Sequence, residues 1–446
     1  MLLPSLGTSI ANVALPTLER AFSASFSEVQ WVVLSYLLAV TTLIVGVGRL
    51  GDMIGRRRLL LGGIGVFALA SAGATIAPNL WVLIAARAVQ GLGAAIMMAL
   101  TVAAVSDVVP KERTGSAMGL LGTVSAVGTA LGPSLGGTLL AWFSWPAVFA
   151  FMAVAGAVTF LLGLWLLPAD AASGQEATSF DVVGMVLLAL SLAAYALSTT
   201  IGGASPSGAN VALAALAAIS LLSFLVVEGR VVSPLVSMAL LRERGLSSGL
   251  VSLGLVSTIM MATLVVGPFY LSEGLGLEPV QIGLVMSIGP GVAALVGLPA
   301  GRLVDSLGYS RVMIVGLIGI TVGAALMTVL PGWFGTGGYI GGLALTTAGY
   351  ALFQAANNTA VMASATKERR GLTSALLGLS RNLGLITGAS AMGAVFALGS
   401  RGLVTFGGKA GPQSGLQVTF AVATILAGLA LLIALRARPP FQPTAI

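Results

Sequence analysis

Residues 48–58 read Gly-Arg-Leu-Gly-Asp-Met-Ile-Gly-Arg-Arg-Arg, and residues 301–311 read Gly-Arg-Leu-Val-Asp-Ser-Leu-Gly-Tyr-Ser-Arg. Both stretches follow the pattern G-R-L-x-D-x-x-G-x-x-R, and both lie between long apolar runs. A loop that recurs in this way indicates that the chain consists of two related halves. Two related halves that rock around a shared cavity are a common design among membrane transporters.

The composition places the chain in a membrane. Of its 446 residues, 57% are hydrophobic and 8% are charged, whereas soluble domains carry about 25% charged residues. One soluble core of this size has no room for so much apolar surface. The apolar runs are about 20 residues long, which predicts transmembrane helices and argues against the strands of a barrel.

The residue types that are missing exclude several functions. The chain has no Cys and no His, which excludes disulfides, thiolate or imidazole metal sites, and catalysis by either side chain. The net charge of +7 is spread over short loops, unlike the basic face of a nucleic-acid-binding protein. We therefore expect no enzyme activity, no metal, no cofactor and no nucleic-acid partner. A nucleotide-driven pump is disfavoured because no G-x-x-x-x-G-K-[ST] loop is present.

The apolar runs predict about fourteen transmembrane helices. They cover residues 1–17, 29–50, 59–77, 80–105, 115–140, 145–167, 180–201, 209–228, 246–271, 280–299, 312–331, 337–362, 371–398 and 415–435. We expect an all-α membrane protein with two pseudo-repeated six-helix bundles and an inserted two-helix hairpin. The predicted domains are an N-terminal bundle at 1–167, a linker and the inserted helix pair at 168–245, and a C-terminal bundle at 246–446.

The basic residues predict the orientation of these helices. All but five of the 21 Lys and Arg residues fall in loops on one side, which the positive-inside rule makes the cytoplasmic side. Both termini are then cytoplasmic. The first predicted helix is short, because from Met1 to Leu15 it rises only about 22 Å against the roughly 30 Å of a bilayer core. Either a thinner bilayer completes this span, or the true start lies upstream.

Four motifs of the chain resemble those of a single protein family. Besides the loop at 48–58, residues 87–95 read R-A-V-Q-G-L-G-A-A, residues 128–137 read G-T-A-L-G-P-S-L-G-G, and residues 8–16 read T-S-I-A-N-V-A-L-P. In this order and on these helices, the motifs resemble those of the major facilitator superfamily, and the last is similar to the opening of its fourteen-helix drug:proton antiporter branch. The resemblance covers essentially the whole chain. One departure is Gly7, since that branch carries an acidic residue at the matching position.

The resemblance implies a function and a location. It implies proton-coupled antiport that exports small amphipathic drugs or metabolites through alternating access, in a multi-pass monomer. The high content of Gly and Ala suggests a bacterial inner membrane as the location. The partners are then a small-molecule substrate, protons and the lipid bilayer. One alternative is export of an anionic or neutral metabolite with Arg87 as the substrate contact. Another is a non-transporting membrane protein such as a sensor, which the missing His, Cys and soluble domain disfavour.

The motifs also imply two mechanical elements. In the family, the 48–58 region is a conformational latch, which here assigns Asp52, Arg56, Asp107 and Asp305; the alternative is a simple positive-inside anchor. Small residues at Gly128, Gly132 and Gly136 share one helix face, and with Pro133 and Gly137 they match the family's hinge and seal. The alternative for these glycines is ordinary close packing of helices.

Polar residues within the apolar helices are the candidates for a substrate cavity. Arg87 lies inside a span, where a charge needs a cavity or a partner, and Gln90 shares its face. Arg87 therefore contacts substrate, supports a proton relay, or only ties helices together. The full set of cavity candidates is Asn12, Trp31, Tyr36, Arg87, Gln90, Met97, Phe269, Tyr270, Gln354, Asn357 and Asn358. Core packing is the alternative for each residue taken alone.

A proton antiporter needs a titratable group, and the carboxylates all fall in loops or near the ends of spans. The candidates for proton coupling are Glu28, at the outer end of the second span, and Glu273, just after the ninth. Solvation at the membrane surface is the alternative role for both. The two charges embedded in spans, Arg87 and Arg381, are positive, which disfavours a lipophilic cation as the substrate.

Overall fold

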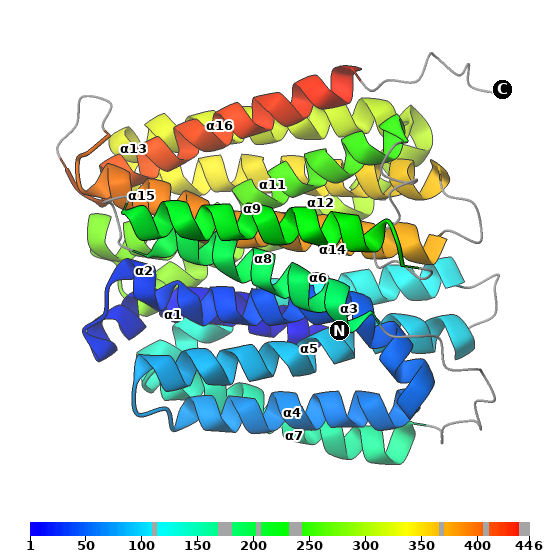
Figure 1. Cartoon of the computed structure of the whole chain (residues 1–446). Helices are drawn as coiled ribbons and strands as arrows, with labels where there is room; N and C mark the ends of the chain where they lie inside the picture. Colours follow the sequence, from blue (N-terminus) through cyan, green and yellow to red (C-terminus); the bar gives the residue numbers. More distant parts are fainter. Residues whose placement is uncertain are drawn as a thin grey trace. The chain divides into compact units, whose positions relative to one another are not determined.

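The computed structural model describes residues 1–108, 114–167, 181–201, 207–231, 243–364, 370–404 and 410–436, and these residues are helical apart from short connections (Figure 1). The chain divides into two units. Unit 1 comprises Met1–Leu235 and Gly276–Ser287, and unit 2 comprises Val236–Leu275 and Ile288–Ile446. The predicted domain boundaries at 167/168 and 245/246 stay a prediction.

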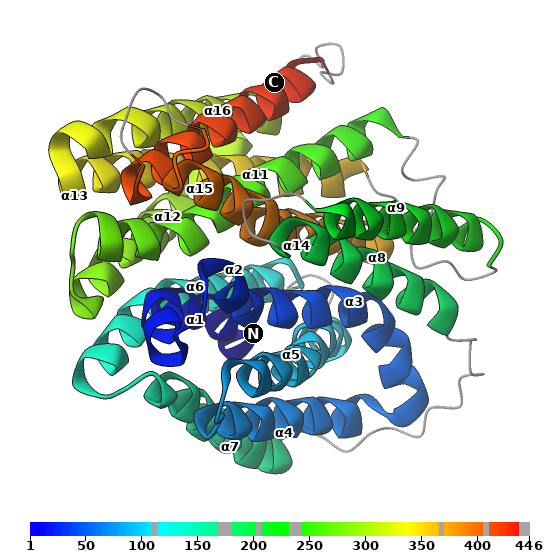
Figure 2. The same ribbon diagram turned by 60° about the vertical axis from the view of Figure 1, so that its left-hand side comes forward.

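The described residues of unit 1 form nine helices and the first part of α12. They are α1 (Leu2–Phe22), α2 (Phe26–Val29), α3 (Trp31–Ile54), α4 (Arg56–Thr75), α5 (Leu80–Val108), α6 (Thr114–Trp142), α7 (Pro146–Leu166), α8 (Val182–Thr200) and α9 (Gly208–Glu228). Helix α5 packs against both α3 and α4, α1 packs against α6, and α4 packs against α7. Helices α8 and α9 form a hairpin, seen side by side in Figures 1 and 2, and α8 contacts α3.

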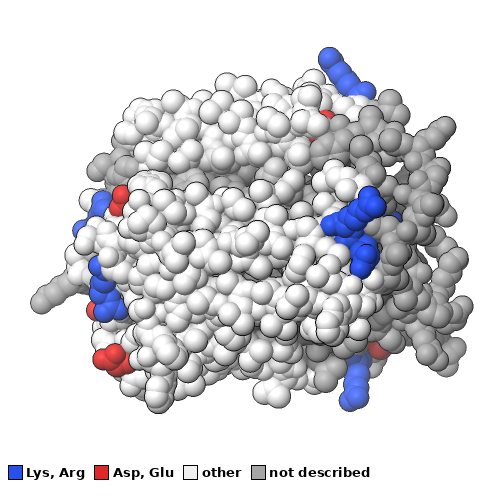
Figure 3. Space-filling model, turned by 90° about the horizontal axis from the view of Figure 1, so that it is seen from below, with Lys and Arg blue, Asp and Glu red and all other residues white. Residues whose placement is uncertain are grey.

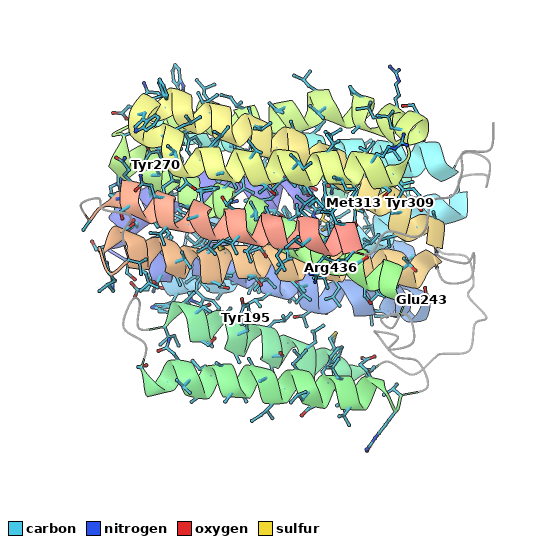
Figure 4. The ribbon with its side chains drawn as sticks, turned by 90° about the horizontal axis from the view of Figure 1, so that it is seen from above. Tyr195, Glu243, Tyr270, Tyr309, Met313 and Arg436 are labelled. Atoms are coloured by element: carbon cyan, nitrogen blue, oxygen red, sulfur yellow. The ribbon has the colours of Figure 1, made fainter. Side chains whose placement is uncertain are left out.

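Unit 2 holds α11, the rest of α12 and the helices that follow α12. The elements are α11 (Arg244–Phe269), the π-helical turn η2 (Tyr270–Gly274), α12 (Pro279–Leu307), α13 (Tyr309–Ser364), α14 (Arg370–Thr387), the π-helical turn η4 (Gly388–Met392), α15 (Gly393–Ser400) and α16 (Pro412–Arg436). Helix α11 packs against α14, and α16 packs against α13 and α15. In Figure 4, Tyr270 lies toward one end of these helices, and Tyr309 and Met313 lie toward the other.

The expected all-helical membrane protein with fourteen helices is confirmed, and eleven helical segments of the described part of the chain are long and apolar enough to cross a membrane. Helix α13 supplies two of the fourteen helices, because its backbone breaks at Gly335 (φ 52°, ψ −127°). The thirteenth crossing consists of α14, η4 and α15 in succession. Gly55 and Gly308, at matching places in the two repeated loops, both adopt positive φ values of 101° and 82°. Glycine takes this conformation without steric cost, which allows a tight connection between consecutive helices at both places.

The expectation of a short first span was wrong. Helix α1 continues through Pro16 and ends only at Phe22, so its 21 residues rise about 31 Å, enough to cross a bilayer core. A proline inside a helix removes one backbone N–H but leaves the later hydrogen bonds possible. Arg20 Nε donates to the Pro16 carbonyl at 3.2 Å, which supports the last turns. Ser23, in the left-handed conformation, ends the helix.

The surface has the pattern of a protein surrounded by lipid. Large apolar side chains are exposed along α4, α7 and α9, among them Leu69, Leu166 and Val211. Exposed aromatic residues cluster near helix ends, namely Trp81, Trp142, Phe143, Trp165, Trp333 and Phe334, as expected for residues at the two membrane–water interfaces. On the face seen in Figure 3, the charged side chains lie toward the two ends, and the band between them is uncharged.

Candidate functional site

Arg87 is the centre of a buried polar cluster in unit 1. It lies on α5 and is fully buried. Its Nε donates to the Val32 carbonyl of α3 at 2.9 Å, its Nη2 donates to the Gly7 carbonyl of α1 at 3.0 Å, and its Nη1 donates to Gln90 Oε1. A charge in a membrane helix is tolerated when polar partners surround it. The three nitrogens of the guanidinium each have such a partner, and together they join α5 to α1 and α3.

Tyr36 covers the same guanidinium. The Arg87 Cζ atom lies 4.3 Å from the centroid of the Tyr36 ring, a cation–π contact. The Tyr36 hydroxyl donates to the Pro4 carbonyl at 2.7 Å, so this ring is held from α1 as well. A Cβ atom on Gly7 would lie 3.1 Å from that hydroxyl. The glycine at this position therefore makes room for Tyr36 where a larger residue would crowd it.

Gln90 connects the cluster to helices α4 and α7. Its Nε2 donates to Ser71 Oγ at 2.6 Å and lies 3.7 Å from Met152 Sδ on α7. Ser71 in turn donates to the Phe67 carbonyl at 2.6 Å. The expectation that Gln90 shares the face of Arg87 is met by their direct hydrogen bond. The result is one connected network of buried polar groups, and such networks fix the helices that contribute to them.

The glycines of α6 lie at close contacts with the backbones of neighbouring helices. Cβ atoms on Gly128, Gly132 and Gly136 would meet α1: the Leu2 carbonyl at 2.5 Å, Ile10 N at 2.9 Å and the Ile10 carbonyl at 3.0 Å, respectively. Gly137 faces α12 instead, where its Cβ would lie 2.7 Å from the Pro279 carbonyl. These glycines therefore allow close approach on two sides of α6.

The contact of α6 with α12 lies wholly within unit 1. A Cβ on Gly283 would lie 2.7 Å from the Pro133 carbonyl, and the hydroxyls of Ser134 and Ser287 are hydrogen-bonded to each other. Pro133 lies inside α6, where it leaves one carbonyl of the preceding turn without its helical donor. The assignment of a hinge and seal to this segment stays a prediction.

The chain matches a known protein family. A family model described as "Major Facilitator Superfamily" matches residues 1–389 and again residues 249–446. The chain belongs to the major facilitator superfamily. It is a transporter of that family and not an enzyme, and its membership explains the two related halves that the repeated loop predicted.

Members of the superfamily with similar sequences carry different names. The chain is 30% identical over 396 residues to "Riboflavin transporter RibZ" of Clostridioides difficile, covering 88% of this chain and 85% of the relative. It is 29% identical over 393 residues to "Multidrug resistance protein Stp" of Mycobacterium tuberculosis, covering 87% and 72%. It is 30% identical over 338 residues to "Putative multidrug resistance protein MdtD" of Escherichia fergusonii, covering 74% and 70%.

Two solved structures of transporters have a similar fold. The nucleoside transporter NupG is similar with a TM-score of 0.64 and 15% identity, over 98% of this chain and 97% of NupG. The peptide transporter POT is similar with a TM-score of 0.70 and 14% identity, over 98% and 93%. At these identities the likeness shows the fold alone.

The other cavity candidates of this major facilitator occupy varied positions in their own units. In unit 1, Asn12 is buried and donates to the Thr8 carbonyl of its own helix, Met97 is buried, and Trp31 donates to Thr200. The structure brings only Arg87, Gln90 and Tyr36 of the candidates together by direct contacts that it describes. The roles of all these residues in substrate binding stay predictions.

In unit 2, Tyr270 stacks on Tyr339 with ring centroids 5.9 Å apart, and its hydroxyl donates to the Pro331 carbonyl at 3.4 Å. Phe269 and Asn357 are fully or almost fully buried, and Asn357 has no hydrogen-bond partner for either amide atom among the described residues. Gln354 is partly exposed and Asn358 is exposed.

Both candidates for proton coupling are exposed. Glu28 lies in the one-turn helix α2, where its carboxylate accepts hydrogen bonds from Ser25 N and Ser25 Oγ, each at 2.7 Å. This is a capping box, in which the carboxylate stabilises the start of the helix. Glu273 lies in the π-helical turn η2. Neither carboxylate is buried among the helices.

The residues assigned to the latch are less fully described. Asp52 is in the last turn of α3, Arg56 opens α4, and Asp107 is near the end of α5. The side chains of Asp52 and Asp107 lie outside the described part of the chain. Asp305, the counterpart of Asp52 in the second repeat, is exposed near the end of α12. The latch stays a prediction.

Sequence reasoning missed several members of the buried network. Ser71 and Met152 bind Gln90, and Thr200 accepts from Trp31. A serine or threonine in a membrane helix gives little signal, because its hydroxyl can always bond to a carbonyl of the preceding turn. Only the packing of helices selects the few hydroxyls that bridge to another helix.

Proposed function

We propose that this transporter exports small amphipathic drugs or metabolites by proton-coupled antiport through alternating access. The observation that carries the proposal is its similarity, over 87% of its length, to a relative named as a multidrug resistance protein. The glycines of α6, in the pattern of the family's exporters, lie at close backbone contacts and so support a role for this helix in the conformational change.

The same proposal includes a place in the cell. The basic loops support an orientation with both termini in the cytoplasm, and we propose a bacterial inner membrane as the location and a monomer as the working form. Glu28 and Glu273 are the proposed proton-coupling carboxylates. Their exposure supports exchange of protons with solvent.

A second candidate is export of a neutral or anionic metabolite. It is favoured by the similarity to a relative named as a riboflavin transporter, over 88% of this chain. The first span has Gly7 in place of an acidic residue, and the buried charge next to it is the cation Arg87. A buried cation without a buried carboxylate beside it repels cationic substrates.

The experiment that tests the proposal uses the full chain in proteoliposomes with a pH dye trapped inside. Cationic, neutral and anionic amphipathic compounds are added in turn, and proton movement is recorded for the native chain and for the Glu28→Gln, Glu273→Gln double variant. Glu278→Gln is the matched control, because Glu278 is also exposed. Antiport predicts proton movement that depends on substrate and is lost only in the double variant.

The outcomes separate the two candidates. Proton movement with cationic compounds supports drug export. A response restricted to anions, and lost in a folded Arg87→Ala variant, supports the metabolite alternative. Substrate flux without any proton movement contradicts proton coupling in both.

A further inference from the structure

Four polar side chains lie along one face of α13, in the part of the helix that follows its break at Gly335. They belong to Tyr350, Gln354, Asn357 and Asn358. Residues three, four, seven or eight positions apart fall on the same side of an α-helix, so these side chains form one continuous band. We call these four residues the α13 polar stripe, and all of them belong to unit 2.

Asn357 is the member of the stripe whose amide group is left without a partner. Its exposed fraction is 0%, and neither its Oδ1 nor its Nδ2 has a hydrogen-bond partner among the described residues. A Cβ atom on Gly249 of α11 would lie 3.1 Å from Asn357 Oδ1, so this amide faces α11. A buried amide in this state costs free energy, which indicates that it takes a hydrogen-bonding ligand.

The rest of the stripe is less covered by protein. Tyr350 and Gln354 are partly exposed, and Asn358 is exposed. Helix α12 covers α13 just before the stripe begins, because a Cβ atom on Gly289 would lie 3.2 Å from Thr347 Oγ1. Helix α11 covers the other end of the stripe. The middle of the stripe lies between these two contacts.

The depth of Gln354 in the membrane limits what its amide can face. Helix α13 ends at Ser364, and Gln354 lies about 15 Å from that end. This is close to the middle of a bilayer core of about 30 Å. Lipid tails cannot hydrogen-bond a polar group at that depth, and polar residues there face the protein interior or water. The partly exposed amide therefore marks a surface that a ligand can reach.

Few charges surround the stripe. Helices α11 and α13 have no charged residue after Arg244 and Arg311, which lie in their first turns. Helix α14, which also contacts α13, contributes the half-buried Arg381 and has no acidic residue. A substrate group on the stripe thus meets mainly carboxamides, each of which offers both a donor and an acceptor.

We propose that the α13 polar stripe selects uncharged substrates that carry an amide or imide group. The carboxamides of Gln354 and Asn358 pair with the N–H and C=O of that group. Asn357, which α11 covers in this structure, joins them when the contact at Gly249 opens. This inference rests on the proposed function, because it names the chemical class of the exported molecule.

The chemistry of a carboxamide explains the selection. A primary amide or an imide presents a donor beside an acceptor and so matches both halves of an Asn or Gln side chain. A carboxylate only accepts hydrogen bonds and an amidinium only donates them, so either one leaves half of each carboxamide unpaired. Unpaired buried groups penalise the wrong ligand strongly.

Three probes of nearly the same shape test the proposal, namely para-butylbenzamide, para-butylbenzoate and para-butylbenzamidinium. They are neutral, anionic and cationic, respectively. Their binding to the full chain in lipid nanodiscs is measured by titration calorimetry, and the heat from empty nanodiscs is subtracted. The benzamide is expected to bind at least about tenfold more tightly than either charged probe. Equal affinities, or no binding of the benzamide, would overturn the proposal.

Two variants show whether the stripe causes the preference. Gln354→Glu keeps the shape of the side chain but replaces its donor by a negative charge, so it should shift the preference toward the benzamidinium. Gln413→Glu is the matched control, because Gln413 is exposed on α16. Asn357→Leu should weaken binding of the benzamide without lowering the thermal unfolding temperature, since it removes an unpartnered buried amide.

The remaining outcomes separate this inference from the proposed function. An unchanged preference in Gln354→Glu would overturn the inference, as would tightest binding of the benzoate that is lost in Arg381→Gln. Proton-coupled antiport in proteoliposomes without any preference for the benzamide would overturn the inference alone. Selective binding of the benzamide without proton-coupled flux would support the site and contradict the proposed function.

Discussion

The guanidinium of Arg87 lies 4.3 Å from the centroid of the Tyr36 ring, and the Tyr36 hydroxyl donates to Pro4 of α1. Arg87 also donates to the Gly7 carbonyl of that same helix. Arg87 of α5 and Tyr36 of α3 thus each donate a hydrogen bond to α1, and their side chains stack on each other. The stack makes the relative placement of these three helices depend on one charged side chain.

Arg87→Lys should destabilise the protein even though it keeps the charge. A lysine ammonium lacks the planar fork that reaches Val32, Gly7 and Gln90 together, and each hydrogen bond lost from a buried charged group costs about 1.5–3 kcal/mol. We expect a clear fall in the thermal unfolding temperature of the purified protein in detergent.

The control for this change is Arg401→Lys, at an exposed position. Unchanged stability of Arg87→Lys together with a large loss of substrate affinity would instead identify Arg87 as a substrate contact. That result would contradict the structural role that its hydrogen bonds indicate.

Gly132→Leu should block transport. A Cβ at residue 132 would overlap Ser9 Oγ and lie 2.9 Å from the backbone N of Ile10, and overpacking of this kind costs about 1–3 kcal/mol. Helix α6 must then move away from α1. Gly73→Leu is the matched control, because a Cβ there meets no atom within 4 Å. Native transport rates in Gly132→Leu proteoliposomes would rule out the hinge and seal.

Asp52→Asn should impair transport more than membrane insertion. The carboxylate occurs at the same place in both repeats although topology needs only the basic residues. Asp305→Asn, at the matching position, provides the comparison. Transport rate is measured per molecule of protein inserted in the membrane. An equal loss of both quantities in Asp52→Asn would mean that the loop is an anchor and not a latch.

Trp31→Phe should loosen the attachment of the inserted hairpin. The indole N–H donates to Thr200 Oγ1 at 3.1 Å and joins the start of α3 to the end of α8. Loss of one such hydrogen bond costs about 1 kcal/mol. Faster hydrogen exchange in α8 and α9 is the expected result, and Thr200→Val should act in the same way. If the double variant shows the sum of both effects, the two side chains do not interact.

Much of the fold was predictable because lipid imposes a simple rule. Backbone groups inside a membrane must bond within their own helix, so long apolar runs gave the number of helices. Two details of the fold were not predicted from the sequence. The first helix was predicted to end at residue 17, yet it continues through Pro16 to Phe22. The thirteenth crossing contains the π-helical turn η4, and no residue pattern in Gly388–Met392 marks it.

The buried polar cluster was only partly predictable. Periodicity places Arg87 inside a span and Gln90 on its face, and the structure joins them. The other two acceptors are backbone carbonyls at residues 7 and 32, and a carbonyl has no signature in the sequence.

The sequence by itself determined that the chain crosses a membrane, how many helices do so, and to which superfamily it belongs. These properties depend on local composition and on short motifs, so neighbouring residues are enough to reveal them. The tertiary structure decided which polar groups meet. A buried charge is stabilised by partners from helices far apart in the chain, as Arg87 is by α1 and α3, and only packing sets which partners come within reach.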